Sequence, residues 1–171
     1  MTITVREESE NDIAAVDEVN EAAFNRRAEA DLVLNLRNHG KVLLSLVAEQ
    51  DGAVIGHILF TPMRIVSDNG DEYAAVGLGP VAVLPEFQKQ GVGSKLMESG
   101  LDRCRKEEHE IMLVLGHPSY YPRFGFRPAV DFGIRCAYDV PDDAFMALEL
   151  TPGALSQVSG KAYYEPEFDG A

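Results

Sequence analysis

The chain has 171 residues, of which 46% are hydrophobic and 25% are charged, a composition typical of one globular domain with a sizeable core. Its formal net charge of −13 argues against a nucleic-acid partner, because phosphate binding draws on clustered Lys and Arg side chains. No apolar run approaches the roughly 20 residues of a membrane-spanning helix, the N-terminal residues do not resemble a secretory signal, and the two cysteines fit a reducing compartment. We therefore expect a single domain over residues 1–171 of a cytoplasmic protein, without a membrane or nucleic-acid partner, as a monomer or homodimer.

The N-terminal part of the chain predicts a strand, two helices and a three-strand meander. Alternation of apolar and polar residues indicates the strand, and apolar residues at helical spacing indicate the helices. An Asp-Gly pair between two apolar runs is a strong hairpin signal. The predicted elements are a strand over residues 2–7, one helix after an N-cap at Ser9, a second from Ala28 to near Gly40, strands on both sides of Asp51-Gly52, and a strand after the turn at residues 67–72.

The C-terminal part begins with a long amphipathic helix from Gly91, on which Cys104 lies on the apolar stripe and is expected in the core. A short buried strand follows at residues 111–116, with extended segments near residues 133–140, 144–150 and 161–168. The strand–helix–strand unit from Val76 to Leu115 should be parallel and right-handed. We predict an α/β fold with a mixed, mostly antiparallel central sheet of about six to seven strands, flanked by helices.

The segment VAVLPEFQKQGVGSKLM, residues 81–97, carries the main functional signal. Pro85 ends the preceding strand because it cannot donate a hydrogen bond to a neighbouring strand. Gly91 and Gly93 remove side chains that would block a close approach to the backbone. The helix begins at the same place, so its free N–H groups and its positive dipole end point to one spot. These features predict a pocket for a phosphate or pyrophosphate.

Two other phosphate-binding loops do not fit this segment. The Rossmann pattern needs a third glycine where Leu96 stands, and the P-loop needs Gly-Lys-Ser/Thr where the chain has Gly93-Ser94-Lys95. What remains is Gln88-x-x-Gly91-x-Gly93, which resembles the acetyl-CoA signature of the GNAT superfamily of N-acetyltransferases.

A second motif strengthens this resemblance. Tyr121-x-x-x-Gly125-Phe126 follows a buried strand, as a Tyr-x-x-x-Gly-Phe motif does in the superfamily, and the order of elements over residues 2–126 also matches. The remaining residues, from Pro128 on, look like a branch of predicted bacterial acetyltransferases whose acceptors are poorly defined.

The resemblance implies acetyl-CoA as co-substrate, bound to an acyl-CoA N-acyltransferase fold in which two parallel strands splay apart. The pyrophosphate would lie on backbone N–H groups of the loop, and the pantetheine arm would pair with the exposed edge of the splayed strand. The N–H of Val81 would polarise the thioester carbonyl. Lys89 and Lys95 would offset the repulsion between an acidic protein and an anionic cofactor. The implied cofactor-binding residues are Val81, Ala82, Val83, Gln88, Lys89, Gln90, Gly91, Val92, Gly93, Ser94 and Phe124.

The resemblance implies a residue for the general acid more clearly than for the general base. Tyr121 occupies the general-acid position of the family, with packing beside the cofactor as the alternative role. Some members carry a glutamate on the splayed strand where this chain has Gly77, and residues 74–84 contain no carboxylate. Glu29 is our candidate for the base, with Glu49, a water chain or a pre-deprotonated acceptor as alternatives.

The predicted function is therefore acetyl transfer from acetyl-CoA to a primary amine, by direct attack within a ternary complex. The acceptor is a small-molecule or protein amine, and the alternative function is a non-catalytic acyl-CoA-binding sensor. We expect no metal, because the four histidines lack ligand spacing. Cys136 and the pair Tyr163-Tyr164 could line a pocket or pack in the fold.

Overall fold

The computed structural model describes residues 2–169, which form two compact units. Within the described residues, the first unit comprises the chain up to Phe60, Gly79–Asp102 and the segment from Pro166, and the second comprises Thr61–Leu78 and Arg103–Glu165. The prediction of one acetyltransferase domain over residues 1–171 stays a prediction. Three elements contribute residues to both units: strand β3 (Ala53–Val66), strand β4 (Glu72–Val83) and helix α3 (Val92–Lys106).

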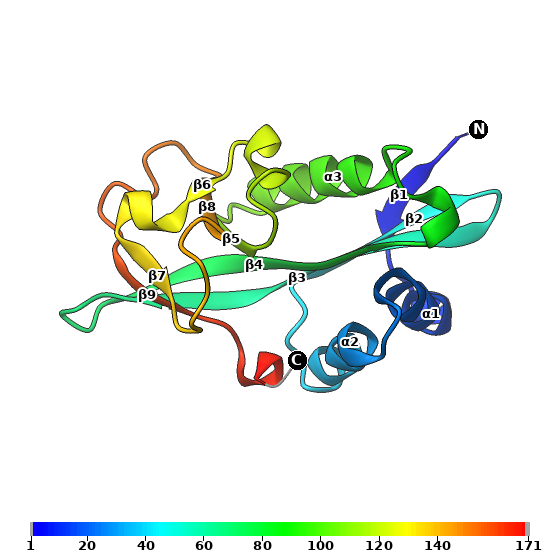
Figure 1. The fold of residues 1–171 in the computed structure, drawn as a ribbon, viewed down its shortest axis with the longest axis horizontal. Helices are drawn as coiled ribbons and strands as arrows, with labels where there is room; N and C mark the ends of the chain where they lie inside the picture. The colour runs from blue at the N-terminus through cyan, green and yellow to red at the C-terminus, as the bar shows by residue number, and fades with distance from the viewer. Residues whose placement is uncertain (1, 170–171) are drawn as a thin grey trace. The chain divides into compact units, whose positions relative to one another are not determined.

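The first unit has strands in the order β1-β2-β3-β4 with helices on both faces. Helices α1 and α2 lie on one side of these strands and the helix α3 lies on the other (Figure 1). The predicted first strand, two helices and Asp51-Gly52 hairpin are confirmed. The elements that complete this unit are β1 (Thr4–Glu7), α1 (Ile13–Phe24), α2 (Ala28–Asn38) and β2 (Leu44–Gln50).

Apolar residues at helical spacing hold α1 and α2 against the sheet. Leu32 and Leu36 lie one turn apart on α2 and are both buried, as the sequence pattern predicts. They share a core with side chains from α1 and from the two central strands, so burial of one apolar stripe stabilises both helices. The buried members of this cluster are Val16, Leu32, Val33, Leu36, Val47 and Leu59.

Two glycines let α3 pack closely on β3. A Cβ atom at Gly100 would lie 2.2 Å from Cζ of the buried Phe60, so only glycine fits there. A Cβ at Gly56 on β3 would lie 3.0 Å from Cγ1 of Val92 and 3.1 Å from Cδ1 of Leu96. This close packing positions the N-terminus of α3, which follows directly on the predicted phosphate loop.

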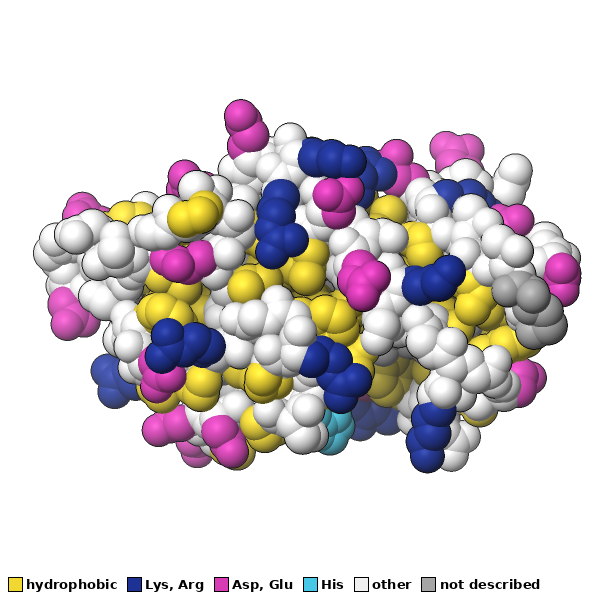
Figure 2. All heavy atoms as spheres, turned by 90° about the horizontal axis from the view of Figure 1, so that it is seen from above, with side chains coloured by type: hydrophobic (Ala, Val, Ile, Leu, Met, Phe, Trp, Pro, Cys, Tyr) yellow, Lys and Arg dark blue, Asp and Glu magenta, His cyan; other side chains and the backbone are white. Residues whose placement is uncertain are grey.

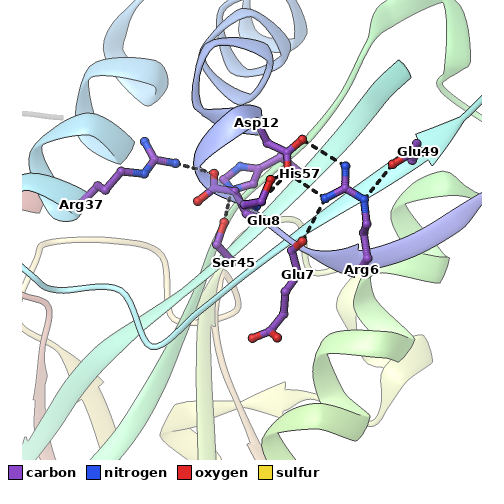
Figure 3. Close-up of polar contacts among 9 residues, drawn as sticks. Arg6, Glu7, Glu8, Asp12, Arg37, Ser45, Glu49 and His57 are labelled. Carbon is purple, nitrogen blue, oxygen red and sulfur yellow. Dashed lines mark hydrogen bonds and ion pairs between the residues drawn. The ribbon is translucent and has the colours of Figure 1, made fainter. Parts of the chain in front are cut away.

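Charged side chains join β1 to β2 and to the start of α1 (Figure 3). Arg6 donates to Asp12 through Nη1 at 2.7 Å and to Glu49 through Nε at 2.7 Å. The hydrogen bond from Arg6 is the main reason why the pKa of Asp12 lies well below its ordinary value. Arg37 of α2 similarly pairs with Glu8.

His57 is fully buried in this unit and contacts two polar side chains, Asn20 and Ser45, of which Ser45 is labelled in Figure 3. Asn20 Nδ2 lies 3.0 Å from the carbonyl oxygen of Val16 and 3.1 Å from His57 Nδ1, so it donates to both. Nδ1 of His57 is therefore the unprotonated nitrogen, and Nε2–H donates to Ser45 Oγ at 2.9 Å. Burial lowers the pKa of His57 to about 3, which keeps the ring neutral and structural.

The second unit has strands in the order β4-β5-β8-β6, while β9 pairs with β3 and β7. Strands β4 and β5 are parallel, with Val76 opposite Met112, so the predicted parallel unit is confirmed. The mixed, mostly antiparallel sheet is confirmed as well, and the described residues contain nine strands because several short ones escape sequence patterns. The strands that complete this unit are β5 (Ile111–Leu115), β6 (Arg127–Pro128), β7 (Ile134–Cys136), β8 (Phe145–Glu149) and β9 (Gly160–Tyr163).

A second hydrophobic core fills this unit. Strands β5 and β8 are almost entirely buried, which explains why their sequences are continuous apolar runs rather than alternating ones. Among residues 2–169, no helix is long and apolar enough to cross a membrane. The buried members of this core are Met63, Ile65, Ala75, Ile111, Leu113, Ala129, Ile134, Phe145, Ala147, Leu155, Val158 and Ala162.

Candidate functional site

The predicted phosphate loop is held by its own glutamine side chains. A short 3₁₀ helix, Pro85–Phe87, follows β4. Gln88 Nε2 then donates to the carbonyl oxygen of Val83 at 3.0 Å, and Gln90 Nε2 donates to that of Glu86 at 3.1 Å. Both amides therefore fold back on the preceding residues, which gives the glutamines of the motif a positioning role that spacing alone does not reveal.

The loop leaves a continuous run of backbone donors unused. Lys89 (φ 63°) and Gly91 (φ 86°) adopt left-handed backbone conformations, of the kind that lets successive N–H groups turn toward one side in anion-binding loops. The N–H of Gln88 donates to the carbonyl oxygen of Pro85 at 3.4 Å. From Lys89 to Ser94, by contrast, no backbone N–H donates to a protein acceptor within residues 2–169. These are the groups available to phosphate oxygens.

Two exposed lysines accompany these donors. Neither Lys89 nor Lys95 forms an ion pair with another described residue, so both ammonium groups can approach an anion. Figure 2 shows Lys and Arg side chains interspersed with Asp and Glu over one face of the protein, so positive charge is available locally despite the net charge of −13. Together with the helix dipole, the lysines make the start of α3 attractive to a phosphate.

The strand before the loop has one edge facing β3 and one facing away. The N–H of Leu84 donates to the carbonyl oxygen of Ile55 at 2.9 Å, which identifies the residues whose backbone faces β3. Because backbone direction alternates along a strand, Ala82 faces β3, while Val81 and Val83 face the opposite edge. The register with β5 ends at Leu78, so β4 runs on without β5 as a partner.

The phenol ring of Tyr121, in the second unit, is fixed by close packing. A Cβ at Gly116 would lie 2.4 Å from Cε2 of this ring, so the glycine makes room for it. Tyr120 and Phe126 hold its other sides in edge-on contacts, with ring centroids 5.1 and 5.9 Å away. Burial raises the pKa of Tyr121 to about 12, and its hydroxyl donates to no other described residue. The phenol is therefore protonated at neutral pH and free to donate to a ligand.

The glycine of the second motif ends the turn that carries Tyr121. Residues Tyr121–Phe124 form a 3₁₀ helix, and Gly125 (φ 100°) closes it in a left-handed conformation that disfavours other residues. Phe124 stands over Tyr120, with ring centroids 5.5 Å apart. The motif spacing thus has a structural reason.

Comparison with known proteins now identifies the family. Residues 4–129 match the acetyltransferase (GNAT) domain. The chain belongs to the GNAT acetyltransferase family. It is 34% identical over 166 residues to the uncharacterized N-acetyltransferase YhbS of Escherichia coli K12, a match covering 96% of this chain and 98% of the relative. Escherichia coli YjhQ is similar at 34% identity over 167 residues, covering 94% of this chain and 92% of the relative.

Two solved GNAT structures extend the comparison. The structure of Escherichia coli YhbS in complex with CoA superposes with a TM-score of 0.92 at 33% identity, covering 98% of this chain and 92% of that one. A GNAT acetyltransferase from Brucella melitensis in complex with acetyl-CoA has a TM-score of 0.81 at 35% identity, covering 98% of this chain and 99% of that one. The predicted family membership and N-acetyltransferase class are confirmed.

Packing explains why this GNAT member has glycine, and no carboxylate, at position 77 of β4. A Cβ atom at Gly77 would lie 2.8 Å from Sδ and 2.9 Å from Cγ of the buried Met63. No glutamate could occupy that place without displacing Met63. A general base, if the reaction uses one, must therefore come from elsewhere in this chain or from solvent.

Both glutamates considered for that role are engaged in ion pairs. Glu29 lies in the first turn of α2 and accepts from Arg26 Nε at 2.9 Å. This hydrogen bond lowers the pKa of Glu29, with burial opposing it in part. Glu49 is paired with Arg6. In the first unit the structure brings together the residues predicted for the cofactor on β4 and the loop, while Tyr121 and Phe124 lie in the second unit.

Cys104 and His39, which were not predicted to belong to the site, have structural contacts. Cys104 is buried on α3 as predicted, and burial raises the pKa of its thiol to about 12. His39 pairs with Glu167 at 2.8 Å. Within the part of the chain that the structure describes, no group of three or more His, Cys, Asp or Glu side chains is placed to hold a metal ion.

Proposed function

We propose that this GNAT enzyme binds acetyl-CoA and transfers its acetyl group to a primary amine by direct attack within a ternary complex. The observation that carries the proposal is the run of unused backbone N–H groups from Lys89 to Ser94 at the N-terminus of α3. The presence of CoA and acetyl-CoA in the two related structures supports the same cofactor here. No metal enters the proposed reaction.

The cofactor would be held mainly by backbone. Phosphate oxygens accept from the free N–H groups, and the two lysines add charge without needing fixed geometry. The outward-facing backbone of Val81 and Val83 pairs with the amides of the pantetheine arm, as an additional strand would. We assign Phe124 to contact with the cofactor on the strength of the motif alone.

The reaction forms a C–N bond, breaks a C–S bond and moves three protons. The neutral amine nitrogen attacks the thioester carbon, and the N–H of Val81 stabilises the resulting oxyanion. As the C–S bond breaks, Tyr121 donates its phenolic proton to the sulfur, giving the free thiol of CoA. The proton lost by nitrogen passes to a base, and the phenolate regains a proton from solvent, so the products are an amide and CoA.

Glu29 is our candidate for the base, and its lowered pKa determines the pH dependence expected for kcat/KM. A carboxylate with a pKa below its ordinary value is ionised throughout pH 5–9, so it can accept a proton over that whole range. Glu29→Gln should therefore reduce kcat/KM by about 10²-fold or more, uniformly over pH 5–9. Arg26→Gln is the matched control, because it removes the ion pair and keeps the carboxylate. A Glu29→Gln variant within twofold of the wild type excludes this role.

Acetyl transfer itself is tested by thiol release from acetyl-CoA across a panel of amines. The panel contains free amino acids, diamines, an aminoglycoside and short peptides with a free N-terminus, and mass spectrometry identifies the acetylated product. The thiol signal from the protein's own Cys104 and Cys136 is measured in a sample that lacks the amine and is subtracted. We expect at least one amine to raise thiol release well above hydrolysis. Tight acetyl-CoA binding with no acetylated product from any amine would instead indicate a non-catalytic sensor.

A further inference from the structure

The second unit contains a hollow that the proposed reaction does not use. It has a volume of about 160 Å³ and is lined by residues from the 3₁₀ helix before β7, from β7, from the loop that follows and from the start of β8. Its size suits a small ligand, since it would hold about five water molecules at roughly 30 Å³ each and lies below the usual range for larger ligands. The lining residues are Val130, Ile134, Arg135, Cys136, Tyr138, Asp139, Val140, Pro141, Asp142 and Phe145.

Apolar side chains line the hollow beside its polar groups, and part of the lining is open to solvent. Ile134 and Phe145 are buried, while the side chain of Val130 is 37% exposed, one of few large apolar side chains so exposed in the described chain. Burial raises the pKa of the Cys136 thiol, so this group stays neutral at pH 7. An aliphatic group in the hollow would cover Val130 and gain roughly 25 cal/mol for each Å² of apolar surface removed from water.

Charges of both signs surround the same hollow without neutralising one another. Arg135, Asp139 and Asp142 all line it, yet none of them forms an ion pair with another residue in the range 2–169. The nearby Arg127, by comparison, is paired with Asp131. A guanidinium and two carboxylates that stay apart around one hollow are complementary to a ligand with an anionic and a cationic group of its own.

One side of the hollow is formed by a tyrosine that stacks on another tyrosine. Tyr138 stacks on Tyr164 with ring centroids 5.8 Å apart and an angle of 16° between the rings. Burial is the main cause that raises the pKa of Tyr164, and the neighbouring Cys136, Tyr138 and Tyr121 raise it further. Tyr138, which lines the hollow, is therefore held in place by its stacking on Tyr164.

We propose that this hollow binds a small aliphatic amino acid as its zwitterion. The carboxylate pairs with Arg135, the ammonium pairs with Asp139 or Asp142, and the side chain lies on the apolar wall. Binding at this site does not require acetyl transfer to occur, so either proposal can fail without the other.

The test is calorimetric titration of the full chain with L-valine, L-alanine and L-leucine, and with two analogues of valine. Isobutylamine lacks only the carboxylate of valine, and isovalerate lacks only the amine. We expect each analogue to bind at least about tenfold more weakly than valine, because a charged hydrogen bond is lost. Arg135→Gln should weaken valine by the same factor and leave isobutylamine unchanged, whereas the double variant Asp139→Asn, Asp142→Asn should weaken valine and leave isovalerate unchanged.

Arg127→Gln is the matched control, since it removes an exposed arginine of the same segment that does not line the hollow. Its affinity for valine should equal that of the wild type. Absence of binding by all three amino acids at millimolar concentration, or a valine affinity unchanged in Arg135→Gln, would overturn the proposal. Mass spectrometry after acetyl-CoA is added then distinguishes two roles of the bound valine. Formation of N-acetylvaline identifies valine as an acetyl acceptor, and unchanged valine identifies it as an effector. Both outcomes require the site.

Discussion

Gly91→Val should weaken acetyl-CoA binding by about 10²–10⁴-fold in calorimetric titration, the equivalent of losing two charge-assisted hydrogen bonds. Gly91 has φ 86° and no atom within 4 Å of its missing Cβ, so a larger side chain there meets no steric clash and only the left-handed backbone opposes it. The valine would instead lie where the phosphates must approach, and its preference for negative φ would turn the free N–H groups away. Both effects act on the cofactor, with a stability cost of about 1–3 kcal/mol from the strained backbone.

A control for this strain exists in the same unit. Gly40 follows α2 with φ 67° and has no atom within 4 Å of its missing Cβ. Gly40→Val therefore imposes a similar backbone strain without touching the loop, and it should lower the melting temperature comparably while leaving acetyl-CoA affinity intact. Equal affinities in the two variants would remove the loop from the cofactor site.

Tyr121→Phe should reduce kcat by about 10²–10⁴-fold with acetyl-CoA affinity nearly unchanged. The ring keeps its contacts with Gly116 and Phe126, because only the hydroxyl is removed. That hydroxyl makes no hydrogen bond within the described residues, so its loss should cost little stability. The measurement is single-turnover kinetics with an amine found in the acceptor screen, together with a calorimetric titration of the cofactor.

Tyr120→Phe is the matched comparison, since this neighbouring ring packs edge-on against Tyr121 and is covered by Arg123 at 4.4 Å from its centroid. It should retain near wild-type kcat. A Tyr121→Phe rate within twofold of wild type, with chemistry limiting, would refute the acid role. Lost affinity with normal kcat would identify Tyr121 as a packing residue.

The parts of the site that could be predicted are those encoded by neighbouring residues. Pro85, Gly91 and Gly93 act on the backbone within one loop, so their spacing is enough to predict a helix start with free N–H groups. Gly125 ends the Tyr121 turn for the same local reason. The parallel β4–β5 pair also follows from chain order, because a strand–helix–strand crossover permits few other arrangements.

Contacts between distant residues were decided only by the tertiary structure. Met63 fills the space beside Gly77, and Asn20 and Ser45 are the hydrogen-bond partners of the buried His57. No sequence motif predicts these partners, because side chains in a core are matched by shape and not by their spacing along the chain.

By itself, the sequence determined the family, the order of the elements and the glycine-containing turn before α3, because each depends on local conformation or on chain order. Only the tertiary structure decided that Lys89 is left-handed, that Val81 and Val83 face away from β3, and that unpaired charges surround the hollow at β7. These properties depend on which backbone edges are already paired and which side chains already have partners. The pairing of backbone edges and of side chains is fixed only when the chain has folded, because the paired groups lie far apart in the sequence.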